Sequence, residues 1–101
     1  MSSTQLYLPI MITIRSFARF RDLFGEERQC TISEQNTVVN VLSALINETQ
    51  VPASTLFNDN GDVHAHLIIM LNKKRMTKAA IAEQILSDGD EIILYPPVSG
   101  G

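Results

Sequence analysis

The chain has 101 residues, of which 45% are hydrophobic, and its formal net charge is −3. This size and composition predict one domain with a single hydrophobic core, and the mild acidity offers no basic surface for nucleic acid. The one cysteine excludes an internal disulfide and favours a reducing compartment, and no apolar run reaches the roughly 20 residues of a membrane-spanning helix.

The chain divides into three parts by pattern. Residues 1–10 have neither a basic stretch nor a long apolar stretch, so they do not resemble a secretory signal. Met11 opens the first patterned strand, and we therefore expect residues 1–10 to be a flexible N-terminal extension. Residues 11–95 are expected to form the domain, and residues 96–101 an extended C-terminal tail.

The first elements are a hairpin and a helix. Residues 11–17 predict a strand with Ile12 and Ile14 on one face, and residues 28–32 predict a second strand that pairs back on it. Residues 18–24 predict a short helical turn between the two. A longer helix follows Thr37, whose hydroxyl is a suitable N-cap. Its apolar positions fall on one helical face, namely Val38, Val41, Leu42, Leu45 and Ile46.

The second half of the chain predicts two more strands. Residues 67–71 form an uninterrupted apolar run, and residues 91–95 form another that ends at Pro96. Residues 76–86 are ambiguous, since Thr77 fits the cap of a short helix but an extended segment also fits. The order of elements predicts an α+β domain with one main helix laid across one face of a sheet.

These two strands are apolar on both faces. Because side chains alternate along a strand, one set faces the helix and the other faces outward. The inward set is Ile69, Leu71, Ile92 and Leu94, and the outward set is Ile68, Met70, Ile93 and Tyr95. An outward apolar patch beside the tail indicates a partner-binding surface. The alternative is that another segment, such as residues 1–10, covers it.

The last residues, Pro96-Pro97-Val98-Ser99-Gly100-Gly101, suggest a tail that is inserted into a partner. Gly100 and Gly101 have no Cβ, so the backbone can enter a narrow channel and the acyl carbon stays open to attack. Pro96 and Pro97 each hold φ near −65°, which stiffens the base of the tail. A terminal carboxylate at neutral pH is ionised and a poor electrophile, so it needs activation before it reacts.

Three stretches of the chain resemble the MoaD/ThiS family of ubiquitin-like sulfur carriers, above all the small subunit of molybdopterin synthase. They are Phe17-Ala18-Arg19-Phe20-Arg21-Asp22-Leu23-Phe24-Gly25, Asp88-Gly89-Asp90-Glu91-Ile92 and the Pro96–Gly101 tail. The resemblance runs from about Met11 to Gly101. Residues 57–72 also resemble archaeal-type members, some of which are protein modifiers. Lys73-Lys74 departs from the family, in which many relatives have glycine after the asparagine.

The resemblance implies a β-grasp fold and a carrier rather than an enzyme. An E1-like adenylating enzyme would use ATP to convert the Gly101 carboxylate to an acyl-adenylate, and a sulfur donor would then leave a thiocarboxylate. The implied partners are that enzyme and the large subunit of molybdopterin synthase or another sulfur acceptor, in the cytoplasm, with no bound cofactor, metal, nucleic acid or membrane. Conjugation of Gly101 to lysines is the alternative function, and an interaction domain with an inert tail is the third.

Three other features have simpler interpretations. Cys30 has the parity of Ile32 in the second strand and is expected to be a small buried residue rather than a sulfur-relay thiol. His64 and His66 lack a third ligand at a suitable spacing, so a metal site is not expected. Lys73, Lys74, Arg75 and Lys78 predict a solvated turn that can also steer an acidic partner.

Overall fold

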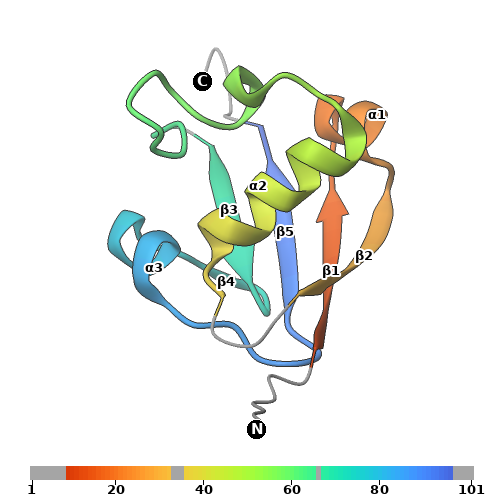
Figure 1. Ribbon diagram of the computed structural model, residues 1–101, viewed down its shortest axis with the longest axis vertical. Coiled ribbons are helices and arrows are strands. Elements are labelled where there is room, and N and C mark those ends of the chain that lie inside the picture. Colours follow the sequence, from red (N-terminus) through yellow and green to blue (C-terminus); the bar gives the residue numbers. More distant parts are fainter. Residues whose placement is uncertain (1–8, 33–35, 66, 97–101) are drawn as a thin grey trace, which may run out of the picture.

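The computed structural model describes residues 9–32, 36–65 and 67–96, and Figure 1 shows their arrangement. The elements in chain order are β1 (Ile10–Ser16), α1 (Arg19–Phe24), β2 (Glu27–Ile32), α2 (Val38–Thr49), the 3-10 helix η1 (Ala53–Thr55), β3 (Ile68–Leu71), β4 (Lys74–Arg75), α3 (Lys78–Glu83) and β5 (Glu91–Tyr95). β1 begins one residue before the expected domain boundary, because Ile10 is buried and pairs with Ile32 of β2. Residues 1–8 lie outside the described residues.

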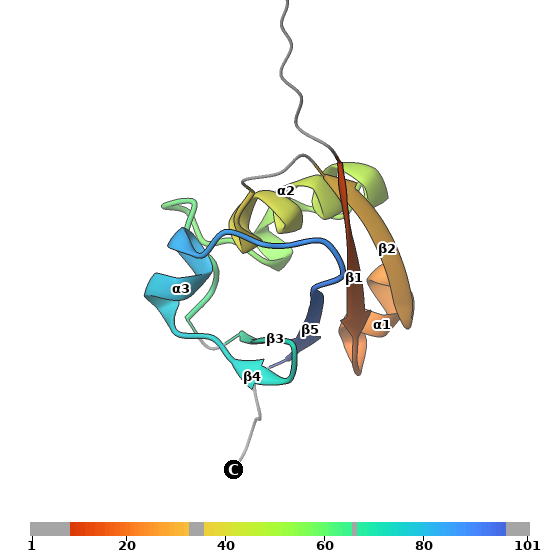
Figure 2. The same ribbon diagram turned by 90° about the horizontal axis from the view of Figure 1, so that it is seen from below.

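The five strands form one mixed sheet in the order β2-β1-β5-β3-β4. β5 is the central strand and runs parallel to β1, whereas the other neighbouring pairs are antiparallel. α2 lies across one face of this sheet (Figures 1 and 2). The predicted hairpin is therefore present as β1 and β2, and the arrangement is the α+β β-grasp fold that was expected.

α2 forms because its ends are satisfied and its apolar positions share one face. The Thr37 hydroxyl accepts a hydrogen bond from the Asn40 N–H at 3.4 Å, which confirms the predicted N-cap. Gln50 adopts the left-handed conformation with φ 59° and donates its N–H to the Ile46 carbonyl at 2.8 Å, which ends the helix. The five predicted apolar side chains are all buried, namely Val38, Val41, Leu42, Leu45 and Ile46.

The ambiguous stretch at residues 76–86 contains α3. The Thr77 hydroxyl accepts a hydrogen bond from the Ala80 N–H at 3.1 Å, so the cap that the sequence suggested is present. A six-residue helix buries only Ile81, and one buried residue defines no period. For this reason the apolar pattern alone did not distinguish the helix from an extended segment.

The core lies between α2 and the inner face of the sheet. The predicted alternation in the strands is confirmed, because the inward residues belong to one buried cluster. These residues are Ile12 and Ile14 of β1, Ile69 and Leu71 of β3, and Ile92 and Leu94 of β5. Phe20 and Phe24 of α1 are buried in the same cluster, with ring centroids 6.3 Å apart. The outward side chains of β3 and β5 do not belong to this cluster.

The turn between β3 and β4 contains two consecutive non-glycine residues with positive φ. Asn72 has φ 51° and Lys73 has φ 72°. Two positive φ values between antiparallel strands are typical of a type I′ hairpin turn, for which Asn-Gly is the preferred pair. Asparagine tolerates this conformation, whereas the Cβ of Lys73 crowds the following carbonyl. The departure of Lys73 from the family pattern therefore has a steric cost.

Replacement of Lys73 by glycine is expected to raise the free energy of unfolding by about 1 kcal/mol, because relief of the left-handed strain exceeds the added chain entropy. The measurement is urea denaturation of both proteins. Lys74→Gly is the matched control, since Lys74 lies in β4 and has no positive φ. This control should lose about 0.5–1 kcal/mol. Equal effects of the two substitutions would show that Lys73 is not strained.

Candidate partner-binding surface beside the C-terminal tail

The tail begins where the central strand ends. β5 lies between β1 and β3, and half-buried Pro96 is the last described residue after it. The Phe17 N–H, directly after β1, donates a hydrogen bond to the Leu94 carbonyl at 3.1 Å, which holds the end of β5 in place. Five predicted site residues lie outside the described residues, and their roles stay predictions. They are Pro97, Val98, Ser99, Gly100 and Gly101.

The outer face of β3 and β5 is apolar beside the base of the tail. Ile68 pairs with Tyr95, and Met70 pairs with Ile93, so all four predicted outward side chains share one face. None of the four belongs to the core cluster. Ile68, Met70 and Tyr95 are half-buried, and each therefore offers surface to a partner. Their role in binding stays a prediction.

Ile93 lies in the centre of this face and is only 7% exposed. It is the cross-strand neighbour of both Arg15 on β1 and Met70 on β3. Long side chains on directly opposite positions lie beside each other on a sheet. The neighbours therefore shield Ile93 laterally, and its contribution to a binding surface is smaller than that of an exposed residue.

Phe17 also belongs to this surface, although the sequence analysis did not assign it there. Its ring stacks on the Tyr95 ring with centroids 4.7 Å apart and an interplanar angle of 8°. Phe17 is 37% exposed. The available signal was its odd position in the predicted strand of residues 11–17, which places it on the face opposite Ile12 and Ile14. We call Phe17, Ile68, Met70, Ile93 and Tyr95 the outer apolar patch.

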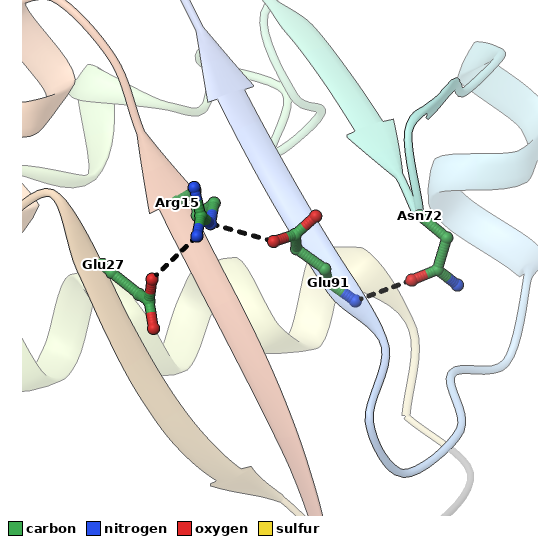
Figure 3. Close-up of polar contacts among 4 residues, drawn as sticks. All are labelled: Arg15, Glu27, Asn72 and Glu91. Carbon is green, nitrogen blue, oxygen red and sulfur yellow. Dashed lines mark hydrogen bonds and ion pairs between the residues drawn. The ribbon is translucent and has the colours of Figure 1, made fainter.

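Charged side chains border the outer apolar patch toward β2. Arg15 Nη2 lies 3.1 Å from Glu27 Oε1, and Arg15 Nε lies 2.9 Å from Glu91 Oε2 (Figure 3). The Arg15 side chain is 45% exposed, so these ion pairs contribute little to stability. They orient the guanidinium across three strands, which gives the apolar surface a polar edge.

The Asp88–Glu91 motif has a structural role in joining strands. Asn72 Oδ1 accepts a hydrogen bond from the Glu91 N–H at 2.9 Å (Figure 3), and Asn72 Nδ2 donates to Asp90 Oδ1 at 2.9 Å. Asp88 Oδ1 accepts from the Met11 N–H at 2.7 Å. The turn before β5 is thereby tied both to the β3–β4 turn and to the start of β1, and the direction of β5 toward the tail is defined.

Comparison with known proteins supplies the decisive observation. A family model described as the ThiS family matches residues 14–101, which include most of the β-grasp domain, the outer apolar patch and the tail. The chain belongs to the ThiS family. Members of this family are small ubiquitin-like carrier proteins and are not enzymes themselves.

Relatives of this ThiS-family chain come from the archaeon Haloferax volcanii. Small archaeal modifier protein 3 is 31% identical over 91 residues, which cover 89% of this chain and 98% of that protein. Small archaeal modifier protein 1 is 35% identical over 65 residues, which cover 64% of this chain and 70% of that protein. The solution structure of the HVO 2177 protein has a TM-score of 0.81 at 28% identity and covers 99% of this chain and 94% of its own. The β-grasp fold is therefore shared with its relatives.

Cys30 of this ThiS-family chain is a core residue, as predicted. Its side chain is 3% exposed, and it belongs to the buried cluster. Burial raises the pKa of the Cys30 thiol, the Glu48 carboxylate raises that pKa further, and Arg28 lowers it. The nucleophilic thiolate is thus disfavoured at neutral pH, which supports a packing role.

His64 has a local partner in the fold. Its Nε2 lies 2.7 Å from the Ser54 carbonyl oxygen, and His66 lies outside the described residues. Within residues 9–32, 36–65 and 67–96, no three His, Cys, Asp or Glu side chains are grouped to hold a metal ion. Among the helices in these same ranges, none is long and apolar enough to cross a membrane.

Proposed function

We propose that this protein is a sulfur carrier whose Gly101 carboxylate is adenylated and converted to a thiocarboxylate. The observation that carries this proposal is the Pro96–Gly101 sequence, which follows the central strand of a ThiS-family β-grasp domain. An E1-like adenylating enzyme is the proposed catalyst, with ATP and a sulfur donor as its other substrates. The carrier contributes the acyl group and the surface by which it is recognised.

The proposed reaction requires no catalytic group on this chain, which supplies only the reacting carboxylate. The Gly101 carboxylate attacks the α-phosphorus of ATP, which releases pyrophosphate and leaves an acyl-adenylate. Sulfide then attacks the activated carbonyl, and AMP departs as the thiocarboxylate forms. With a persulfide donor, the first product is an acyl disulfide, which a second thiol must cleave. The adenylate is needed because the ionised carboxylate is a poor electrophile.

The rigid attachment of the tail to the domain supports this proposal. β5 is held on both sides by neighbouring strands, and the Phe17–Tyr95 stack lies directly before Pro96. The six residues 96–101 span roughly 20 Å when extended. A partner that docks on the outer apolar patch can therefore receive the terminus at an internal site.

We further propose that the sulfur is delivered in molybdopterin biosynthesis, with the large subunit of molybdopterin synthase as acceptor partner. This part rests on the resemblance of the three motifs to the small subunit of that enzyme. The single thiol, Cys30, suits a reducing environment, and we propose the cytoplasm as the site of both steps.

Protein modification is the second candidate function. The observation that favours it is the likeness to two proteins named small archaeal modifier proteins. In this case a lysine amine, instead of sulfide, attacks the activated Gly101 carbonyl and forms an isopeptide bond as AMP or an enzyme thiol departs. The two functions share the activation step and differ in the nucleophile.

Intact-mass spectrometry separates these functions. The purified protein is incubated with ATP, sulfide and an E1-like adenylating enzyme from the same cells. The proposal predicts a mass increase equal to the difference between sulfur and oxygen, located on the C-terminal peptide. Gly-Gly remnants on lysines of other proteins, without that mass increase, would support the modifier function. Neither product, with binding to the adenylating enzyme intact, would contradict both.

A further inference from the structure

α3 lies on the flank of the domain away from β1 and β2 (Figures 1 and 2), and residues of α3 line a second candidate binding site. It is a pocket of about 870 Å³, which is within the usual size range of ligand sites. Its walls come from the start of α2, residues 61–65 with Leu67, the end of β4 with the two residues after it, and α3. None of the outer apolar patch residues lines it. The pocket and the outer apolar patch thus share no residue, although they adjoin at β4, where Arg75 of the pocket pairs with Met70 of the patch.

The floor of this pocket is apolar. Leu67 and Ile81 are buried core residues, while Val39 and Met76 are half-buried at the margin of the same core. When a partner covers apolar surface that is partly open at the edge of a core, the free energy of the complex is lowered. The size of the floor suits one or two apolar side chains rather than a large flat interface.

One wall of the pocket is cationic. Arg75 and Lys78 line it, and both are exposed. Among the described residues, neither has a carboxylate within ion-pair distance, whereas Arg15 has two. Four of the eight Lys and Arg residues of this acidic chain fall within positions 73–78. Two of these four cations, Arg75 and Lys78, line the pocket, and neither forms an ion pair with the described residues, which favours a ligand with carboxylates at that end.

An acidic residue of the lining restricts the choice of ligand. Asp62 lines the pocket and is exposed. A uniformly anionic polymer or an anionic membrane would place negative charge against Asp62 as well as against Lys78, which is unfavourable. A short peptide with an apolar segment followed by carboxylates places its charge at one end only. The distribution of charge in the pocket therefore matches an acidic peptide.

We propose that this pocket binds an acidic peptide segment of a partner protein, with its apolar side chains over Leu67 and Ile81 and its carboxylates near Arg75 and Lys78. This inference goes beyond the proposed function and does not depend on it, because binding requires no reaction at Gly101. A carrier could be held by one protein through the pocket while another engages its tail.

The test is a titration of the isotope-labelled, unmodified protein with capped peptides, followed by amide chemical shifts. The probe is Ser-Leu-Phe-Asp-Asp-Ser, and its matched controls are Ser-Leu-Phe-Lys-Lys-Ser and Ser-Ala-Ala-Asp-Asp-Ser. We expect saturable shifts at Val39, Met76 and Ile81 with the probe. Both controls should bind at least about tenfold more weakly, since each lacks one of the two interactions.

Two pairs of exposed substitutions locate the site on the protein. Lys78→Glu should weaken probe binding about tenfold, whereas Lys74→Glu makes the same charge change outside the pocket and should have a much smaller effect. Ala82→Glu should block the pocket, whereas Ala79→Glu, on the same helix but not in the lining, should not. Thermal unfolding of each variant verifies that it is folded.

Several outcomes would overturn the proposal. They are the absence of saturable shifts up to about 2 mM peptide, shifts centred on Ile93 and Tyr95, or equal losses within each pair of variants. Tighter binding of single-stranded oligonucleotides or of phosphatidylserine vesicles than of the probe would equally reject an acidic peptide as the ligand.

Discussion

Deletion of Gly101 is expected to abolish adenylation and thiocarboxylate formation while the free energy of unfolding stays unchanged. The deletion retracts the carboxylate by roughly 3.5 Å. A misplacement of 1 Å at a reacting centre already costs about 100-fold in rate, so activity should fall by at least that factor. Stability should be preserved because the buried cluster is formed from residues 10–94. The measurements are release of pyrophosphate, intact mass and urea denaturation.

Two matched proteins sharpen this experiment. Asp59→Asn, in an exposed turn outside the tail and the outer apolar patch, keeps both the chain length and the Gly-Gly terminus, and it should retain sulfur transfer. A short peptide tag after Gly101 keeps every native residue but removes the free carboxylate, and it should be inactive. Sulfur transfer by the tagged protein would show that the Gly101 carboxylate is not the reactive group.

Introduction of aspartate into the outer apolar patch is expected to weaken docking on the adenylating enzyme. Met70 and Tyr95 are both half-buried on this face, and a carboxylate there would be desolvated by the partner. Tyr95→Asp also removes the stack on Phe17. A loss of about 2 kcal/mol per substitution, or roughly 30-fold in Kd, is typical of residues that dominate an interface. Isothermal titration calorimetry with the adenylating enzyme measures it.

Ile85→Asp is the control for these variants. Ile85 is an exposed apolar residue, 52% accessible, and lies outside the outer apolar patch, so the same change of chemistry there should leave binding unaffected. Unfolding curves must show that Met70→Asp and Tyr95→Asp remain folded. If the three variants bind equally, the apolar face of the sheet is not the docking surface, and its coverage by residues 1–10 becomes the better explanation.

Much of the fold was predictable because the apolar residues of a single helix or strand repeat with the period of that element. The five apolar positions of α2 and the alternation in β1, β3 and β5 each define a buried face without reference to the rest of the chain. Thr37 and Thr77 were recognisable as caps for the same reason, since a cap involves residues only three positions apart. β4 was missed because two residues, Lys74 and Arg75, carry no alternation.

The candidate site was less predictable because its contacts join distant positions. The Phe17–Tyr95 stack and the low exposure of Ile93 both depend on which strands are neighbours, and parallel pairing of β1 with β5 is not visible in either segment. The motif at Asp88–Glu91 was recognised as a family signature, but its hydrogen bonds to Met11 and Asn72 were not anticipated. The pocket beside α3 combines four segments and has no signature of its own.

By itself, the sequence determined the type of element at most positions, the inward and outward faces of β3 and β5, and the family to which the terminal motif points. These are local properties, set by spacing and by the chemistry of neighbouring residues. Only the tertiary structure decided that Arg15 borders the apolar surface, that Phe17 stacks at the base of the tail, and that an apolar pocket has one cationic wall. Each of these depends on long-range pairing, which the packing of the whole core selects.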